Sequence, residues 1–218
     1  MASLYLKAAL LTAAIALLGF FFISQLDAMR TNEIKSAVDE LVLQTESERQ
    51  MFLYWQVLGN SSDELCSYFS DTTGKRAERT YDLSQKISYY EKSNIMSQEY
   101  EMLKNQYYVS NAGLYLNLMA AEKYCEGSPY TKVLFFYRVN EDCPECMTQG
   151  GVLDNLRAAY PNLRVFAFPY DTNQELVKML VKRHSITSAP ALVIDDREVL
   201  RGFADFGTIE ARLKARSS

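Results

Sequence analysis

The chain contains one pair of cysteines whose spacing suits redox chemistry, Cys143 and Cys146, with a proline and a glutamate between them. An apolar, strand-like stretch, residues 132–137, precedes the pair, and a helical pattern over residues 147–161 follows it. In a C-x-x-C motif at a strand-to-helix turn, the two thiols lie one helical turn apart and can close into a small disulfide ring. The spacing therefore predicts a thiol–disulfide exchange site.

A zinc site is an alternative for this motif, because C-P-x-C also occurs in zinc knuckles. A knuckle usually continues with glycine and needs a second ligand pair nearby, whereas here Met147 follows and the other two cysteines, Cys66 and Cys125, are distant in sequence. Because His184 is the single histidine of the chain, most metal sites and catalytic mechanisms that rely on histidine are excluded. We expect no metal and no other cofactor, and we interpret His184 as a surface residue that caps a helix.

The composition argues against one class of partner. The net charge of the 218 residues is −4, so no basic stripe is available to neutralise nucleic-acid phosphates. Hydrophobic residues make up 48% of the chain and charged residues 23%, which is typical of a folded protein. The length suits one large domain or two small ones.

Residues 130–218 carry an alternating pattern of strands and helices. The expected strands are 132–137, 163–168, 191–195 and 199–203, and the expected helices are 143–160, 173–184 and 208–216. Short connections in the order βαβαββα predict parallel pairing first and an antiparallel hairpin at the end. Asp171, Asp195 and Asp196 fall in turns and need no functional role.

Two motifs give this region its resemblance to a known family. The first is the Cys143–Cys146 pair, and the second is Ser188-Ala189-Pro190, immediately before the strand at 191–194. Together with the strand order, they resemble the thioredoxin family, in which a cis-proline loop faces the dithiol. The expected fold class is α/β: a C-terminal thioredoxin-like fold, preceded by an α-helical bundle-like region and an N-terminal transmembrane helix.

The resemblance implies a role for each matching residue. Cys143 would be the nucleophile, at a helix N-terminus whose partial positive charge favours a thiolate, and Cys146 would be the resolving thiol. The Ala189–Pro190 loop would bind an extended client peptide through strand-like hydrogen bonds. The implied partners are proteins that contain cysteine.

The sequence departs from the thioredoxin pattern around the dithiol. Tyr137 stands six positions before the first cysteine, where thioredoxins carry a buried carboxylate, and Asp142 replaces an aromatic residue. Glu141, Asp142 and Glu145 surround one thiol with carboxylates, and like charge raises the pKa of the Cys143 thiol. The couple would then be more reducing. Alternatively, these acids face solvent and are screened, which leaves the thiol pKa unchanged.

Residues 29–127 are expected to form a helical domain resembling a small bundle. Apolar spacing predicts a helix over residues 34–55, a loop at 71–74, a helix over 81–90 and a long helix over 97–126. Cys66 and Cys125 fall on different helices, each on a face that must be buried. They could form a structural disulfide, remain two packed thiols or act as a redox relay.

The stretch from Ala8 to Leu26 is almost wholly apolar and carries no charge. Its 19 residues give roughly 28 Å of helix, close to the hydrocarbon thickness of a bilayer. We expect an uncleaved anchor within residues 1–28, and the alternative is a cleavable signal peptide. Flanking charges do not decide the orientation, but the paired cysteines favour an extracytoplasmic location for the rest of the chain.

These features predict a membrane-tethered thiol–disulfide oxidoreductase organised as residues 1–28, 29–127 and 130–218. Its substrates would be extracytoplasmic proteins, and a membrane protein is a candidate redox partner. The alternative is a non-catalytic thioredoxin-like peptide-binding module or a subunit of a membrane complex, because a pure enzyme has no evident need of the helical middle.

Overall fold

A computed structural model describes residues 10–25, 42–43, 46–47, 49–51, 53–54, 62–125, 130–138 and 143–215. The chain divides into two compact units, Met1–Asn60 and Ser61–Ser218. The sequence instead suggested boundaries near residues 28 and 128. The second of these does not separate two units because, within Ser61–Ser218, a helix of the helical middle packs directly on the sheet.

The first unit contains a helix over residues 10–25 whose large apolar side chains are exposed. Within the described part of the chain, no helix is both long enough and apolar enough to cross a membrane. Residues 8, 9 and 26 of the anchor expected over Ala8–Leu26 lie outside the described residues. Much of the helix expected over residues 34–55 lies outside the described residues.

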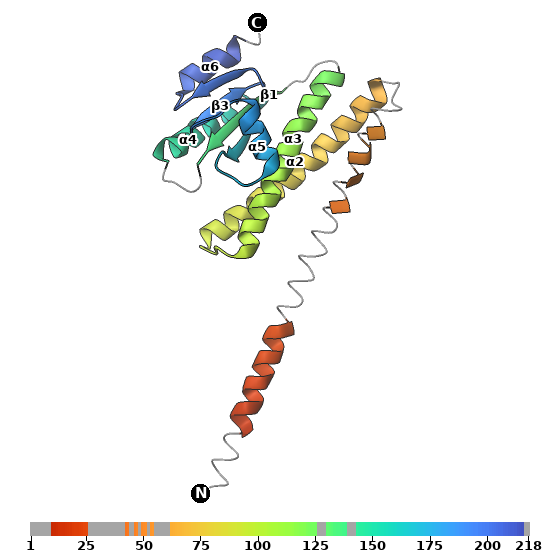
Figure 1. The fold of residues 1–218 in the computed structure, drawn as a ribbon, viewed down its shortest axis with the longest axis vertical. Helices are drawn as coiled ribbons and strands as arrows, with labels where there is room; N and C mark the ends of the chain where they lie inside the picture. The colour runs from red at the N-terminus through yellow and green to blue at the C-terminus, as the bar shows by residue number, and fades with distance from the viewer. Residues whose placement is uncertain are drawn as a thin grey trace. The chain divides into compact units, whose positions relative to one another are not determined.

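Two long helices open the second unit. They are α2 (Ser62–Lys92) and α3 (Gln98–Tyr124), and they pack against each other (Figure 1). Ser97 caps α3, because its side-chain oxygen accepts a hydrogen bond from the backbone N–H of Tyr100 at 3.3 Å and so satisfies one free donor of the first turn. The hydroxyls of Thr80 and Ser110 lie 2.8 Å apart where the two helices meet.

The loop predicted at residues 71–74 is wrong: this segment is helical, and the helix predicted over 81–90 is a later part of the same α2. Threonine and glycine are poor helix formers, but here tertiary contacts outweigh that preference. Asn117 of α3 donates hydrogen bonds through Nδ2 to the hydroxyls of Thr72 at 3.0 Å and Thr73 at 2.9 Å. Polar side chains that favour a loop in isolation therefore hold the two helices together.

The remaining elements form a four-stranded sheet with helices on both faces. In chain order they are β1 (Thr131–Tyr137), α4 (Pro144–Ala159), β2 (Leu163–Pro169), α5 (Glu175–Arg183), β3 (Ala191–Ile194), β4 (Glu198–Arg201) and α6 (Phe206–Lys214). The strand order is β2-β1-β3-β4. β1 pairs in parallel with β2 and antiparallel with β3, and β3 pairs antiparallel with β4. The predicted α/β class and the order of these elements are confirmed.

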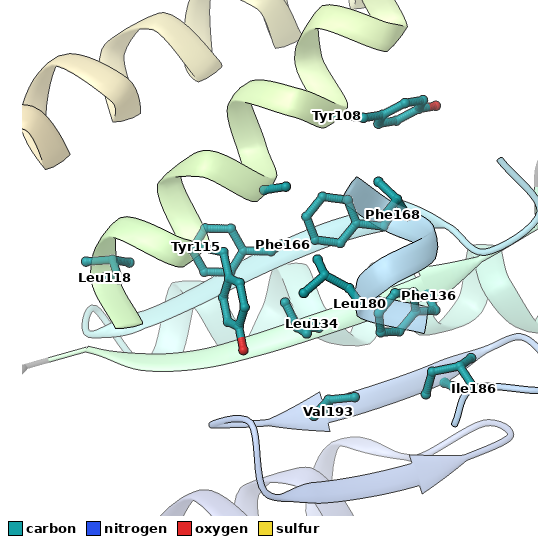
Figure 2. Close-up of a cluster of buried hydrophobic side chains, with 13 residues drawn as sticks. Tyr108, Tyr115, Leu118, Leu134, Phe136, Phe166, Phe168, Leu180, Ile186 and Val193 are labelled. Carbon is teal, nitrogen blue, oxygen red and sulfur yellow. The ribbon is translucent and has the colours of Figure 1, made fainter. Parts of the chain in front are cut away.

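Strand β1 lies inside the sheet and is buried on both faces. Its side chains alternate, so that Val133 faces one core and Leu134 faces the other. α4 and α6 complete the first core. α3 and α5 complete the second, whose side chains are shown in Figure 2. In the second core the rings of Tyr115 from α3 and Phe166 from β2 meet edge to face at 5.5 Å. This packing fixes the carboxyl end of β1, after which the dithiol motif follows.

Candidate active site around Cys143 and Cys146

Cys143 and Cys146 form a disulfide at the N-terminus of α4, with their Cα atoms 5.2 Å apart. Cys143 is the N-cap residue, and its sulfur accepts a hydrogen bond from the backbone N–H of Cys146 at 3.2 Å. Pro144 occupies the first helical position, where a missing N–H costs no hydrogen bond. The sulfur of Cys143 therefore lies beside the N–H groups of the first turn, which favour a thiolate once the disulfide is reduced.

The two sulfurs differ in their surroundings. Cys146 is only 6% exposed and belongs to the core formed by β1, α4 and α6, together with Leu153 and Leu192. Cys143 is half-buried and lines an open pocket. Access favours Cys143 as the thiol that attacks, whereas the buried position of Cys146 suits a thiol that reacts within the protein.

The cis-proline loop lies against the dithiol. The peptide bond between Ala189 and Pro190 is cis, and Ala189 lines the same pocket as Cys143. The carbonyl oxygen of Pro190 accepts a hydrogen bond from the backbone N–H of Gly202 at 2.9 Å, which ties the loop to the end of β4. The structure thus brings together two motifs from distant parts of the sequence.

Charges of both signs line this pocket. Of the three predicted acids, Glu145 is exposed and lines the pocket, whereas Glu141 and Asp142 lie outside the described residues. Sequence reasoning missed a cation in the same pocket, Arg138. Its Nη2 donates a hydrogen bond to the hydroxyl of Tyr170 at 3.3 Å, and its guanidinium lies 5.5 Å from the centre of that ring. No motif or periodicity marks Arg138, and its place directly after β1 is the one signal that could have found it.

Tyr137 occupies the place where thioredoxins carry a buried carboxylate. It packs against the core that contains Cys146, and its hydroxyl lies 3.3 Å from the hydroxyl of Tyr108 on α3. Burial raises the pKa of Tyr137, and the neighbouring Tyr108 adds to this effect. A neutral phenol therefore stands here at physiological pH, as the sequence departure suggested.

Cys66 and Cys125 form a second disulfide, with their Cα atoms 5.6 Å apart. It joins the first turns of α2 to the C-cap of α3. Close to that C-cap, Glu122 pairs with Lys132 at the start of β1, with Oε2 2.6 Å from Nζ, whereas Cys143 follows the other end of this strand. The seven residues of β1 span on the order of 20 Å. The second disulfide is therefore too far from Cys143 for direct exchange.

His184 is buried, which differs from the expected surface position, although it does cap α5. Its Nε2 lies 2.9 Å from Oδ1 of Asp196. The same oxygen accepts hydrogen bonds from the hydroxyl of Tyr115 at 2.9 Å and from Nε of Arg183 at 3.0 Å. The difference arises because the turn after β3 folds back onto α3 and α5. This cluster lies at the opposite end of β3 from Pro190, away from the dithiol.

Comparisons with known proteins find only distantly similar solved structures. No protein-family model matches the chain, and no curated protein matches it. The chain is similar to chloroplastic thioredoxin z (18% identity, TM-score 0.37), with 49% of this chain and 89% of that chain covered. It is also similar to thioredoxin O1 from Arabidopsis thaliana (19% identity, TM-score 0.35), with 47% of this chain and 89% of that chain covered. A third similar structure is mitochondrial thioredoxin 3 from Saccharomyces cerevisiae (19% identity, TM-score 0.30), with 40% of this chain and 78% of that chain covered.

These similar structures are thioredoxins. Their TM-scores are too low to assign a function to this chain. The chemistry of the site therefore follows from the geometry of the two cysteines, the cis-proline and the sheet that holds them.

Proposed function

We propose that this protein is a thiol–disulfide oxidoreductase that acts on proteins containing cysteine. The observation that carries the proposal is the Cys143–Cys146 disulfide at the N-terminus of α4, which shares a pocket with the cis-proline loop at Ala189. A dithiol with one accessible and one buried sulfur suits exchange with a second disulfide.

The reaction transfers two electrons between the dithiol and a client disulfide. The Cys143 thiolate attacks one client sulfur, so that a mixed disulfide forms, the client S–S bond breaks and the second client sulfur leaves as a thiolate. Cys146 then loses its proton to water or to that thiolate and attacks the sulfur of Cys143, so that the mixed disulfide breaks and the first client sulfur leaves as a thiolate that is protonated by water. The client is released as a dithiol, and the protein is left as the disulfide. The reverse sequence oxidises a client dithiol.

The cis-proline loop is the proposed docking edge for the client. An extended peptide can add to an exposed strand edge through backbone hydrogen bonds. Ala189 lies just before β3 and lines the pocket that holds Cys143. A client segment paired along this loop would therefore carry its own cysteine to the sulfur of Cys143.

Insulin reduction by the full chain, with dithiothreitol as the electron source, tests this proposal. We expect catalytic turnover in the parent and none in Cys143→Ser. Stoichiometric capture of insulin without turnover would favour the non-catalytic binding module instead. A folded parent that neither reduces nor captures insulin would contradict both functions.

We also infer that residues 8–26 hold the protein at a membrane, with Ser61–Ser218 outside the cytoplasm. The uncharged apolar stretch supports the first part, and the Cys66–Cys125 disulfide supports the second because such bonds persist in oxidising compartments. An impermeant thiol reagent should label reduced Cys143 on intact cells. Release of the protein by alkaline carbonate, or labelling only after lysis, would contradict this inference.

A further inference from the structure

Arg138 is held beside the dithiol at the carboxyl end of β1. It lines the pocket together with Cys143, Glu145 and Ala189. Tyr170 orients its side chain, because the phenol oxygen accepts a hydrogen bond from Nη2 at 3.3 Å and the ring lies 5.5 Å from the guanidinium carbon. A hydrogen bond and a cation–π contact to the same ring restrict where the guanidinium can point.

Tyr170 is itself fixed by the sheet. Its backbone N–H donates a hydrogen bond to the carbonyl oxygen of Tyr137 at 2.8 Å, directly beyond the paired residues of β1 and β2. The aromatic ring that orients Arg138 therefore stands on the sheet. Because this arrangement limits the freedom of the arginine in advance, little entropy is lost when its charge acts on a neighbouring group.

The two charges in the pocket act in opposite directions on the sulfur. The carboxylate of Glu145 disfavours a thiolate, but its side chain is exposed and its field is screened by water. Arg138 is half-buried, so its positive charge is screened less and favours the thiolate. The acidic residues identified in the sequence are therefore not the only charges that act on the Cys143 thiolate.

We propose that Arg138 stabilises the thiolate of Cys143 and that Tyr170 is the positioning residue that holds the guanidinium in place. This inference rests on the proposed function, in which Cys143 is the attacking thiol. Two glutathione thiols reduce the disulfide: they give up two electrons and two protons and join as glutathione disulfide, while the Cys143–Cys146 bond breaks. Cys146 takes up one proton and becomes a thiol, Cys143 is left as a thiolate, and the second proton goes to water. Because Arg138 favours that thiolate, it stabilises the reduced form and makes the couple more oxidising.

The test compares the full chain with Arg138→Gln, Arg138→Lys and Tyr170→Phe. Arg157→Gln is the matched control, because Arg157 is an exposed arginine of α4 that lies on the order of 20 Å along the helix from Cys143. One readout is the thiol pKa of Cys143, followed by the ultraviolet absorbance of the thiolate. The other is the equilibrium of the disulfide with reduced and oxidised glutathione.

We expect Arg138→Gln to raise the thiol pKa and to shift the glutathione equilibrium about three- to tenfold toward the disulfide, where tenfold corresponds to roughly 30 mV. Arg138→Lys should keep most of the parent behaviour, and Tyr170→Phe should shift both readouts in the same direction by less. Adding Glu145→Gln to Arg138→Gln should return the equilibrium toward that of the parent. Each shift should shrink as salt is raised.

The inference is overturned if Arg138→Gln keeps the parent thiol pKa and equilibrium, or if Arg157→Gln shifts them equally. It is also overturned if Arg138→Lys behaves like Arg138→Gln, because the arginine would then act through packing. If Arg138→Gln does not fold, Tyr170→Phe still tests the inference. An unchanged thiol pKa of Cys143 in Tyr170→Phe would show that Tyr170 does not position the guanidinium. Neither readout uses a client protein, so a failure to reduce insulin would count against the proposed function and leave this inference standing.

Discussion

Gln149 of α4 and Ala204, which lies between β4 and α6, exchange two hydrogen bonds in the core. Nε2 of Gln149 donates to the carbonyl oxygen of Ala204 at 3.1 Å, and the backbone N–H of Ala204 donates to Oε1 at 2.8 Å. Gln149 is fully buried. Close to Ala204, the N–H of Gly202 binds the carbonyl oxygen of Pro190. One side chain therefore joins the helix of the dithiol to the segment that supports the cis-proline loop.

Gln149→Leu should lower the free energy of unfolding by about 2–4 kcal/mol, because it leaves a buried N–H and a buried C=O of Ala204 without partners. Urea denaturation measures the change. Thr148→Ala is the matched control, since the Thr148 hydroxyl is bonded to the carbonyl oxygen of Pro144 on the exposed face of α4, and its loss should cost less than about 0.5 kcal/mol. Equal stability of Gln149→Leu and the parent would refute the structural role of this pair.

Replacing both Cys66 and Cys125 by alanine should lower the melting temperature and leave insulin turnover intact. The disulfide closes a loop with a sequence separation of 59, which stabilises the folded state by about 4 kcal/mol on a chain-entropy estimate. Each single variant should lose as much as the double variant, because either one breaks the same bond. A loss of turnover at an unchanged melting temperature would instead indicate a relay to Cys143.

Cys146→Ser should accumulate mixed disulfides through Cys143, because the thiol that resolves them is absent. Gel electrophoresis without reductant detects the adducts, and Cys143→Ser, which lacks the accessible thiol, should form none. In the reduced parent, an alkylating reagent should modify Cys143 before Cys146, since Cys146 is buried. Modification in the reverse order would exchange the two roles.

His184 should make stability depend on pH near neutrality, because it is the single histidine of the chain and no other ordinary side chain titrates there. Burial lowers the pKa of His184 from 6.5, and the Asp196 carboxylate offsets only part of this. The unfolded chain therefore binds the proton more readily than the folded protein. The stabilisation is present above about pH 6.5 and is lost as the pH falls through that value toward the folded-state pKa.

Urea denaturation of the parent and of His184→Gln, at about pH 7.5, 6 and 5, checks this expectation. The parent should lose stability on acidification, and the variant should lose much less.

At still lower pH, the parent and the variant should both lose further stability. Burial alone would raise the pKa of Asp196, but hydrogen bonds from Arg183 and Tyr115 outweigh it and hold the pKa below 3.8, so protonation of this carboxylate destabilises the fold. A parent whose stability is constant between pH 7.5 and 5 would contradict the role of His184.

Local patterns in the sequence determined the secondary structure of residues 130–218. The seven elements expected there match the observed ones to within two residues at each end. Alternating and helical spacing is a property of the chain itself, since it reflects which face of each element is buried. The same reasoning failed at Thr72 and Thr73, because a contact from Asn117, distant in sequence, keeps that segment helical.

The dithiol could also be predicted from the sequence, because Cys143 and Cys146 are neighbours on one helical turn. Only the tertiary structure placed Arg138 beside that dithiol and Tyr170 against Arg138, paired Gln149 with Ala204 and set α3 on the sheet. These contacts join residues from separate elements, and they depend on how the parallel β1–β2 pair and its covering helices pack. Packing between separate elements produces no periodic pattern in the sequence. The positive charge of Arg138 near Cys143 could therefore be identified only from the tertiary structure.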